Sequence, residues 1–515
     1  MGFAFSRPAA AAALPAPLPT LTIRNLTITP LELKLVERLE SHPHPHSHKP
    51  NGLVKTKSHA TSRRGSHEHD TSPEPSTESQ QEEGERSWRA RHDITGVAIK
   101  PFSECHTPVY KPDPTHHEKL RLTFEDTSTG HRYSAEIPGP ARRSIVLKAH
   151  PKGSEDETKE FTAIYLPQHA YLALFSSAHL ESWMSTLDPS LPLSALSIPG
   201  THNSPTCHVA LPSVRCQAVP VLDQLNNGVR FLDVRVSSPA FTPPPDTTNT
   251  SPNPSAIPEL ALVHSAFPIS LTGTKQLSAL LATLYAFLAA HPTETLLLSL
   301  KREGTGRGTD QHLSQILQHH YIAPNAARWY TSPQIPTLAE ARGRIVLVRR
   351  FLLAPSVPAE QGGIDGSVWP DNVADGTCGS GTIRIQDYYG VGSSAEIQRK
   401  VRFAQEGLER AAQGVGARTA REVPEGGPQI PLFINFLSAS NFFNASCWPD
   451  RIAVKINPSM IEYMCMGHGS PRDGSGLDIG DAATGIVVTD WVGNHGDWDL
   501  IRCIVGWNAR LQLQQ

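Results

Sequence analysis

Short apolar runs that alternate with helical or loop stretches fill the chain after residue 190, and they limit the fold more than any other feature. A helix is predicted between two of the runs, over 274–291. Eight strands with such connections over 190–510 predict an α/β fold, a TIM-type β/α barrel. Several connections lack an obvious helix, so we expect the barrel to be irregular. The predicted strands are LSALSI (193–198), VRFLDV (229–234), LALVH (260–264), TLLLSL (295–300), RIVLVR (344–349), TIRIQD (382–387), PLFINFL (431–437) and GIVVTD (485–490).

The chain before residue 190 has a different pattern. Apolar and polar residues alternate over 21–36, which is typical of half-buried strands, and strand-like segments continue to residue 168. They predict an N-terminal β-sandwich-like domain over 21–168. Residues 170–187 are predicted to form a helix that leads into the barrel.

Two segments of this half have no strand pattern. Residues 41–93 are rich in His, Ser, Glu and Pro and poor in apolar residues, so we expect a disordered linker inside the β domain. Residues 1–20 are expected to be a flexible N-terminus.

Composition excludes several classes of function. The formal net charge of −3 gives no reason to expect nucleic acid as a partner. No apolar run is long enough for a transmembrane helix, and the N-terminus lacks the layout of a signal peptide. We therefore expect a cytoplasmic or peripheral membrane protein. Seven cysteines without a CxxC motif fit a reduced compartment, although Cys207 and Cys216 would be close enough in sequence to pair in an exported chain.

Polar residues follow nearly every predicted barrel strand, at the end where barrel enzymes place their active sites. Each alone is weak evidence, because a histidine or arginine after a strand is more often structural. Together they are costly to bury unless they serve a ligand. The strand ends deliver His202, Asn203, Asp233, Arg235, His264, Lys301, Arg349, Arg350, Asp387, Tyr389, Ser438 and Asp490.

The chemistry of this set favours a phosphodiester. Arginine and lysine side chains indicate an anion, and guanidinium groups match phosphate oxygens. Two histidines suit an acid–base pair, one removing a proton from a nucleophile and the other protonating the leaving oxygen. No serine or cysteine lies in an obvious nucleophile elbow, so the nucleophile is expected to be the substrate's own hydroxyl or water.

The motifs SIPGTHNS, GVRFLDVRV, LVHSAF, ETLLLSLKRE, GRIVLVRRF, IQDYYG, FINFLSAS and GIVVTDWVG occur in this order over 190–510. They resemble the catalytic (X) domain of phosphatidylinositol-specific phospholipase C, the bacterial type more closely. The resemblance implies a phosphoric diester hydrolase or lyase that cleaves phosphatidylinositol-type lipids to diacylglycerol and inositol (cyclic) phosphate. It also implies transient contact with a membrane surface.

The resemblance further implies roles for individual residues. His202, which a Pro199-Gly200 turn would present, resembles the general base, and Asp490 the carboxylate that orients it. His264 resembles the general acid. Arg235 resembles the phosphate-binding arginine, with Asp233 as the acid beside it. The residues that resemble those holding the inositol ring are Lys301, Arg350, Asp387 and Tyr389.

Asn203 departs from the bacterial pattern, in which aspartate commonly follows the first histidine. Asparagine here resembles the calcium-dependent eukaryotic enzymes, where it is a metal ligand. Those enzymes carry acidic ligands at the positions of Arg235 and Lys301, where this chain has cations that would repel Ca²⁺. We therefore expect a site without metal or other cofactor, in which Asn203 contacts substrate and lowers activity or shifts the balance between cyclisation and hydrolysis.

Two other functions stay open at this point. One is a barrel phosphodiesterase for another headgroup, such as a glycerophosphodiester, which would need a carboxylate-rich metal site. The other is a catalytically weak lipid- or phosphate-binding protein that keeps the barrel. The presence of both histidines and Arg235 argues against the second.

Overall fold

The structure of the protein is a computed structural model. The described residues are 18–39, 90–139, 144–150, 159–177, 179–241, 258–379, 381–416, 429–469 and 482–512. No helix among them is both long enough and apolar enough to cross a membrane.

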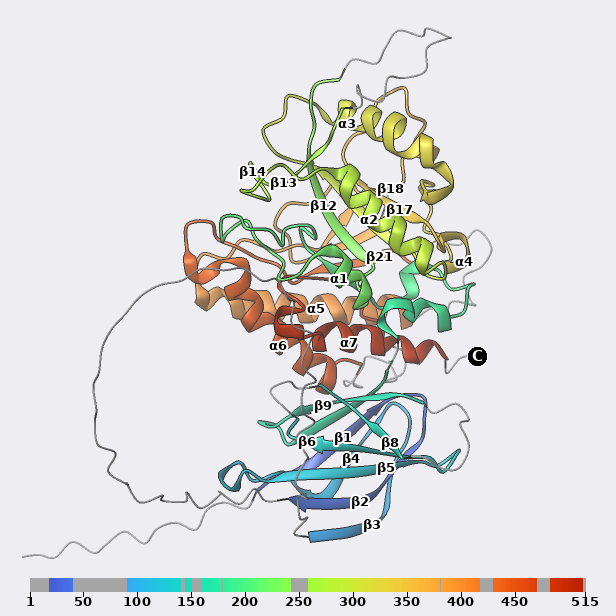
Figure 1. Cartoon of the computed structure of the whole chain (residues 1–515), viewed down its shortest axis with the longest axis vertical. Helices are drawn as coiled ribbons and strands as arrows, with labels where there is room; N and C mark the ends of the chain where they lie inside the picture. Colours follow the sequence, from blue (N-terminus) through green and yellow to red (C-terminus); the bar gives the residue numbers. More distant parts are fainter. Residues whose placement is uncertain are drawn as a thin grey trace, which may run out of the picture.

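The first ten strands form two five-stranded sheets (Figure 1). One sheet has the order β4-β1-β10-β9-β7 and the other β3-β2-β5-β6-β8, and only β1 and β10 pair in parallel. The strands are β1 (Thr20–Leu26), β2 (Leu31–Leu39), β3 (Ala90–Ile99), β4 (Ser103–Tyr110), β5 (Lys119–Asp126), β6 (Arg132–Ile137), β7 (Ser144–Val146), β8 (Lys148–His150), β9 (Phe161–Leu166) and β10 (Tyr171–Ser176).

The alternation of side chains along these strands explains how the two sheets pack. On β1, Leu21 and Ile23 point into a core shared with the second sheet, which contributes Leu122 and Phe124. Leu26, on the opposite face of β1, belongs to the large core of the rest of the molecule. The first sheet is therefore covered on both faces, which is why its central strands are almost continuously buried.

Two predictions for this region are wrong. Residues 170–187 are not one helix, because 171–176 form β10 and only 180–186 form a 3₁₀-helix. A strand buried on both faces is a continuous apolar run, and its period does not distinguish it from a buried helix. Residues 90–93 of the predicted linker belong to β3, and the rest of that linker, like 1–17, lies outside the described residues.

A curved, mainly parallel sheet forms the second half of the molecule. Seven parallel strands lie in the order β17-β15-β12-β11-β22-β21-β20. Their bounds are β11 (Ile198–Thr201), β12 (Phe231–Ser237), β15 (Leu296–Arg302), β17 (Ile345–Arg350), β20 (Ile383–Gln386), β21 (Leu432–Phe436) and β22 (Ile486–Thr489).

Short strands flank this sheet. β16 (Trp329–Tyr330) and β18 (Ile364–Asp365) pair in parallel with β17, and β19 (Gly376–Cys378) pairs antiparallel with β20. No pairing between the described strands joins the β17 edge to the β20 edge, so the sheet is an open half-barrel. The predicted α/β class with an irregular barrel is confirmed in this coarser form.

The prediction of a barrel strand at 260–264 is wrong. Residues 261–264 form β13 (Ala261–His264), which pairs antiparallel with the end of β12 and forms a hairpin with β14 (Phe267–Pro268). A run of four apolar residues does not reveal the direction of a strand. The first predicted strand also begins late, because 193–195 form a 3₁₀-helix.

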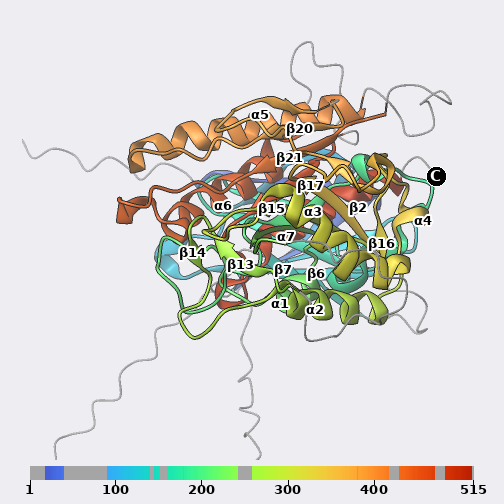
Figure 2. The same ribbon diagram turned by 90° about the horizontal axis from the view of Figure 1, so that it is seen from above.

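Helices cover the sheet on two sides. Figure 2 shows α5 and α2 on opposite sides of the molecule, with β15 and β17 between them. Figure 1 shows α6 and α7 between the parallel sheet and the β1–β10 sheets, and both helices contact β10. The α-helices are α1 (Val221–Asn226), α2 (Leu277–Ala290), α3 (Asp310–Ile316), α4 (Leu338–Ala341), α5 (Ile397–Gly416), α6 (Pro449–Met466) and α7 (Asp499–Gly506).

A buried arginine joins the two halves. Arg24 of β1 is fully buried and donates to the carbonyls of Cys465, at 3.0 Å, and His468, at 2.8 Å, at the C-terminal end of α6. A cation is favourable there, because the last carbonyls of a helix lack partners and carry its negative dipole end. The contact fixes the end of α6 to the first sheet.

Candidate active site

The loop after β11 begins the site, and its position depends on a close approach of two strands. A side chain at Gly200 would meet the Cβ of Phe231 on β12 at 3.0 Å, so glycine lets β11 lie against β12. Pro199 and Gly200 lie within β11, which corrects the expected Pro-Gly turn. The chain turns only after the strand, and Asn203 takes a left-handed φ of 42°.

His202 is held from behind by Asp490, which follows β22. The His202 Nδ1 lies 3.0 Å from Asp490 Oδ1, and the carboxylate can only accept there, so Nδ1 carries the proton. Gln217 fixes both residues, because its Nε2 donates to the His202 carbonyl at 2.6 Å and lies 3.4 Å from Asp490 Oδ1. Burial raises the pKa of Asp490, although His202 opposes the shift. In the neutral imidazole, the other His202 nitrogen, Nε2, then carries no proton and can accept one.

The side-chain amide of Asn203 contacts His202 Nε2 in the free protein. Its side-chain Nδ2 lies 3.1 Å from His202 Nε2, and its backbone N–H donates to Asp233 Oδ2 at 3.1 Å. The asparagine is almost fully buried. A substrate hydroxyl that used His202 as a base would have to displace the Asn203 amide first.

Asp233 is the buried centre of an ion-pair network. It accepts from Arg235 on its own strand at 3.1 Å and from Arg350 of β17 at 3.3 Å. Burial alone would raise the pKa of this carboxyl, but Arg235 and Arg350 outweigh it and hold the pKa well below its usual range. The carboxylate is therefore ionised and fixes two guanidinium groups.

Glu303 is a site residue that the sequence reasoning missed. It accepts from Arg235 at 2.9 Å, from Lys301 at 2.8 Å and from the backbone N–H of Ser265 at 2.8 Å. Burial would raise the pKa of Glu303, but Arg235 and Lys301 lower it. Arg235 thus lies between two carboxylates, those of Asp233 and Glu303. Glu303 stands two residues after Lys301, and the period of a strand could have revealed it.

His264 comes from the β13–β14 hairpin and faces His202. The two ring centroids are 5.7 Å apart and the rings are nearly perpendicular. The His264 Nδ1 donates to the Val214 carbonyl at 2.8 Å. Burial, Arg235 and His202 together lower the pKa of His264 to about 4, with burial the largest cause. The imidazole is therefore neutral in the free protein near pH 7.

A cavity of about 330 Å³ opens beside the two histidines. It is lined by seven of the ten residues predicted for the site, while Asn203, Asp233 and Asp490 lie behind them. The predicted residues that line it are His202, Arg235, His264, Lys301, Arg350, Asp387 and Tyr389. Ser438 also lines it, whereas Arg349 points elsewhere and pairs with Asp365 at 2.9 Å.

Trp369 organises the far side of the cavity. It is half-buried and lines the cavity. The Arg350 guanidinium lies 3.7 Å from its ring centroid, and its Nε1 donates to Asp387 at 2.9 Å. Tyr389 donates to Asp371 at 2.7 Å and presents a partly exposed ring at the mouth.

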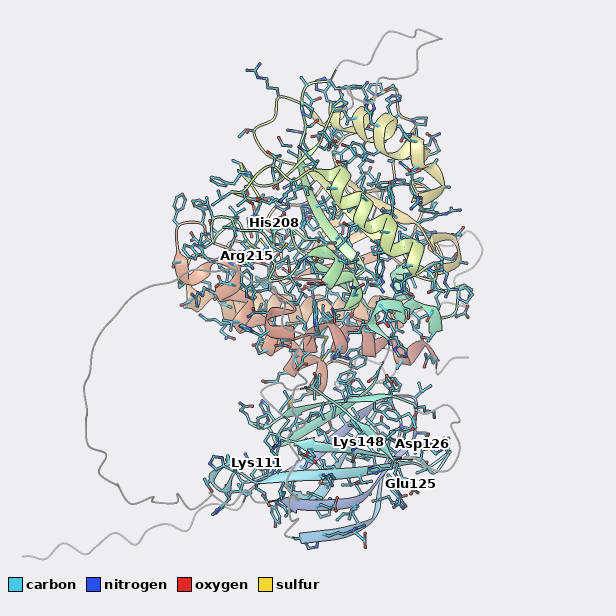
Figure 3. The ribbon with its side chains drawn as sticks, viewed as in Figure 1. Lys111, Glu125, Asp126, Lys148, His208 and Arg215 are labelled. Atoms are coloured by element: carbon cyan, nitrogen blue, oxygen red, sulfur yellow. The ribbon has the colours of Figure 1, made fainter. Side chains whose placement is uncertain are left out.

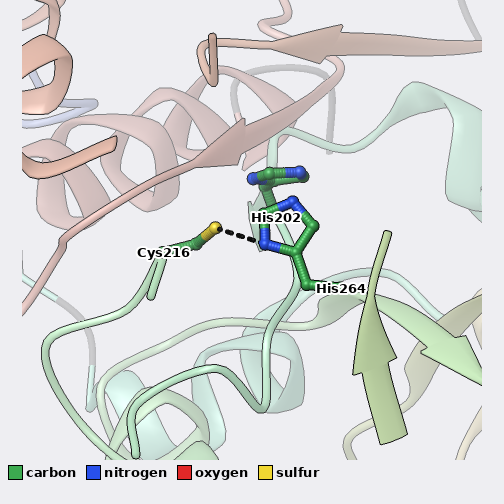
Figure 4. A group of neighbouring side chains, drawn as sticks. All are labelled: His202, Cys216 and His264. Atoms are coloured by element: carbon green, nitrogen blue, oxygen red, sulfur yellow. Dashed lines mark hydrogen bonds between the residues drawn. The ribbon is translucent and has the colours of Figure 1, made fainter. Parts of the chain in front are cut away.

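Cys216 is the second residue near the site that the sequence reasoning missed. Its Sγ lies 3.7 Å from His264 Nδ1 (Figure 4). Cys207 and Cys216 are both free thiols, so the suggested disulfide is absent from the described structure. Cys216 comes from the irregular segment between β11 and α1, where no periodicity indicates which side chains face the site.

Comparison with known proteins agrees with this geometry. Residues 189–351 match the family model described as phosphatidylinositol-specific phospholipase C, X domain. The family resemblance seen in the motifs is thereby confirmed. The matched segment carries both histidines, Asp233, Arg235, Lys301, Glu303 and Arg350, while Asp387, Tyr389 and Asp490 lie beyond it.

Similar proteins are two curated bacterial enzymes. The 1-phosphatidylinositol phosphodiesterase of Listeria monocytogenes is 30% identical over 184 residues, which are 34% of this chain and 50% of that protein. The chain thus spans half the length of that relative. The 1-phosphatidylinositol phosphodiesterase of Staphylococcus aureus (strain Newman) is 24% identical over 343 residues, which are 64% of this chain and 93% of that protein.

Similar solved structures are those of phosphatidylinositol-specific phospholipase C from the same two species. The S. aureus structure has a TM-score of 0.47 at 22% identity and covers 64% of this chain and 97% of its own. The L. monocytogenes structure has a TM-score of 0.45 at 20% identity and covers 64% of this chain and 99% of its own.

The electrostatics of the site predict the titration of His264. Replacing Arg235 with glutamine removes a cation that disfavours the imidazolium and leaves Asp233 and Glu303 in place, so the pKa of His264 should rise from about 4. Burial remains, so it should stay below the ordinary value of about 6.5. The measurement is the imidazole NMR shift of His264 against pH in metal-free buffer.

Arg384→Gln is the control for this titration, because Arg384 pairs with Asp375 outside the cavity. It should leave the pKa of His264 unchanged. An unchanged or lower pKa in Arg235→Gln would show that Arg235 does not set the charge of His264.

Proposed function

We propose that this protein is a phosphodiesterase that cleaves phosphatidylinositol-type lipids to diacylglycerol and inositol (cyclic) phosphate by acid–base catalysis. One observation carries the proposal: His202 and His264 face each other with ring centroids 5.7 Å apart, and both line a cavity beside Arg235. A base, an acid and a fixed cation in one cavity are the groups that in-line attack on a phosphodiester requires.

The proposed first step uses the Nε2 nitrogen of His202, after the substrate hydroxyl displaces the Asn203 amide. This nitrogen removes the proton of an inositol hydroxyl, and the oxygen attacks phosphorus while the bond from phosphorus to the diacylglycerol oxygen breaks. His264 gives its proton to that leaving oxygen. Asp490 stabilises the imidazolium formed on His202, because it already accepts from Nδ1. Water attack on the cyclic phosphate, with the roles of the histidines reversed, completes the hydrolysis.

His264 must be protonated to act as the acid, and the substrate supplies a reason for this. In the free protein the nearby Arg235 opposes a second positive charge. A phosphodiester bound to Arg235 brings a negative charge that offsets the guanidinium, so proton uptake by His264 becomes favourable as substrate binds. Lys301, Arg350, Asp387 and Tyr389 line the remaining cavity and are proposed to hold the inositol ring.

The Asn203 contact favours a slow variant of this function. The amide on His202 Nε2 competes with the substrate hydroxyl for the same nitrogen. A weak enzyme, or a protein that binds inositol phospholipid without rapid turnover, is the second candidate that this contact supports. The division into a β domain over 21–168 and a catalytic unit over 190–510 remains part of the proposal.

An aromatic rim at the cavity mouth supports contact with a membrane surface. We define the rim as Phe267, Phe442 and Phe443. Phe443 is 95% exposed, and Phe442 stacks on Phe267 with ring centroids 5.3 Å apart. Ser265 and Ser440, two residues before Phe267 and Phe442, line the cavity. Exposed aromatics beside a lipid-cleaving site are favourable at the membrane interface.

The acid–base pair predicts the effect of removing either histidine. His202→Ala and His264→Ala should each lower turnover of phosphatidylinositol by roughly 10²–10⁴, measured as release of water-soluble inositol phosphate. His208→Ala is the matched control, because this half-buried histidine on the same loop (Figure 3) does not line the cavity. Normal turnover by a folded His202 or His264 variant would remove that residue from the mechanism.

The position of Arg235 predicts catalysis without an activating metal. Its guanidinium can stabilise charge on the phosphorane through preorganised hydrogen bonds. EDTA should therefore not lower activity on phosphatidylinositol, and Arg235→Asp should abolish it. If chelation abolished wild-type activity and Ca²⁺ restored it, Asn203 would be a metal ligand and the role given to Arg235 would be wrong.

The aromatic rim predicts a difference between lipid surfaces and soluble substrates. The double variant Phe442→Ser, Phe443→Ser should bind phosphatidylinositol vesicles roughly 10- to 100-fold more weakly, because burial of each phenyl ring at the interface is lost. Cleavage of a short-chain monomeric phosphatidylinositol should be retained. Val146→Ser, an exposed site on β7, is the control, and equal losses on both substrates would refute a surface role for the rim.

A further inference from the structure

A thiol and two imidazoles converge at the inner end of the cavity. One ligand atom each from His202, Cys216 and His264 lies within 4.8 Å of the others. Figure 4 shows the three side chains pointing toward one another from separate segments of the chain. Cys216 is fully buried, while both histidines line the cavity, so the cluster is reached from the substrate side.

Hydrogen bonds of its backbone N–H and carbonyl fix the position of Cys216, and with it the position of the thiol. Its N–H donates to the Thr206 hydroxyl at 3.1 Å, and its carbonyl accepts from the N–H of Trp491 at 2.9 Å. A buried cysteine usually behaves as a small apolar side chain. Here the sulfur lies 3.7 Å from the Nδ1 of His264 and 3.5 Å from the Val214 carbonyl, which is a polar surrounding.

The donor set matches one class of metal ion. Thiolate sulfur with imidazole nitrogen is the ligand combination of Zn²⁺ and similar soft divalent ions, whereas Ca²⁺ and Mg²⁺ require oxygen ligands. Zinc bonds of about 2.3 Å to sulfur and 2.0–2.1 Å to nitrogen place tetrahedral ligand atoms roughly 3.3–3.6 Å apart. The sulfur and the His264 nitrogen, 3.7 Å apart, nearly satisfy this spacing already, and a shift of at most about 1.5 Å in His202 would complete it. Three protein ligands leave a fourth position for water.

We propose that His202, Cys216 and His264 form a Zn²⁺ site whose occupation switches the acid–base pair off. Binding takes the thiol proton of Cys216 into solvent, displaces the Asn203 amide from His202 Nε2, and forms one metal–sulfur and two metal–nitrogen bonds. His264 gives up its hydrogen bond to the Val214 carbonyl, and its ring proton moves from Nδ1 to Nε2. Neither histidine then can exchange a proton with substrate, so the metal inhibits rather than activates.

The inhibition rests on the proposed function, but the metal site does not, and two measurements keep them apart. The first is titration of the metal-free protein with Co²⁺, a spectroscopic substitute for Zn²⁺. Wild type should develop a thiolate-to-cobalt charge-transfer band at one equivalent, and Zn²⁺ should displace it. Cys216→Ser should lack the band. His264→Gln keeps the thiol and should bind Co²⁺ at least about 10-fold more weakly.

The matched control is Cys207→Ser, which removes a neighbouring free thiol that does not belong to the cluster. It should keep the cobalt band. A wild-type protein without the band, or a Cys216→Ser variant that keeps it, would overturn the site.

The second measurement is phosphatidylinositol cleavage with added Zn²⁺, each variant being compared with its own metal-free rate. Zn²⁺ should inhibit wild type and Cys207→Ser, EDTA should restore the rate, and Cys216→Ser should need at least about 10-fold more Zn²⁺. Equal inhibition of wild type and Cys216→Ser would overturn the proposal. A cobalt band that depends on Cys216 in a protein without activity would keep the metal site and refute the proposed function instead.

Discussion

The buried carboxylate of Asp233 is the contact on which the rest of the site depends. It lies on β12 and holds Arg235 of the same strand, Arg350 of β17 and the backbone N–H of Asn203 after β11. Removing a charge from water is costly, and it is tolerated here because two guanidinium groups and an amide pair with one carboxylate. The same pairing keeps the carboxyl ionised, since it holds the pKa well below the usual range. Without this anion, Arg235 and Arg350 would lose their shared acceptor, and the N–H of Asn203 beside His202 would lose its own.

Contacts through α6 connect the β1–β10 sheets with the site. Arg24 of β1 binds the carbonyls at the C-terminal end of this helix, and Asn457 within the helix donates to the Asp490 carbonyl at 3.0 Å. Asp490 in turn holds His202. A continuous set of contacts thus runs from the first strand of the chain to the proposed base.

The sequence predicted well the elements that have a regular apolar pattern. It also predicted well the residues that follow barrel strands, where barrel enzymes place their active sites. The parallel strands and α2 were located within a few residues, and seven of the ten residues predicted for the site line one cavity. The failures have physical causes. β13 is antiparallel because it folds back along β12, and a four-residue run contains no information about direction. Glu303 was missed because the fourth strand was ended at residue 300, although it runs to Arg302. Cys216 lies in an irregular segment whose approach to His264 is set only by long-range contacts.

The ion pairs around Arg235 decide how much of its guanidinium remains for a ligand. The contacts to Asp233 and Glu303 use Nε and one hydrogen on each terminal nitrogen, and a guanidinium has five N–H groups. Two N–H groups are therefore left over, one on each terminal nitrogen, and guanidinium N–H groups of this kind bind phosphate oxygens. The carboxylates fix the plane of the group before any ligand arrives. Binding of a phosphodiester would then need no rotation of the arginine and no loss of its buried partners, so the electrostatic stabilisation is preorganised rather than assembled during the reaction.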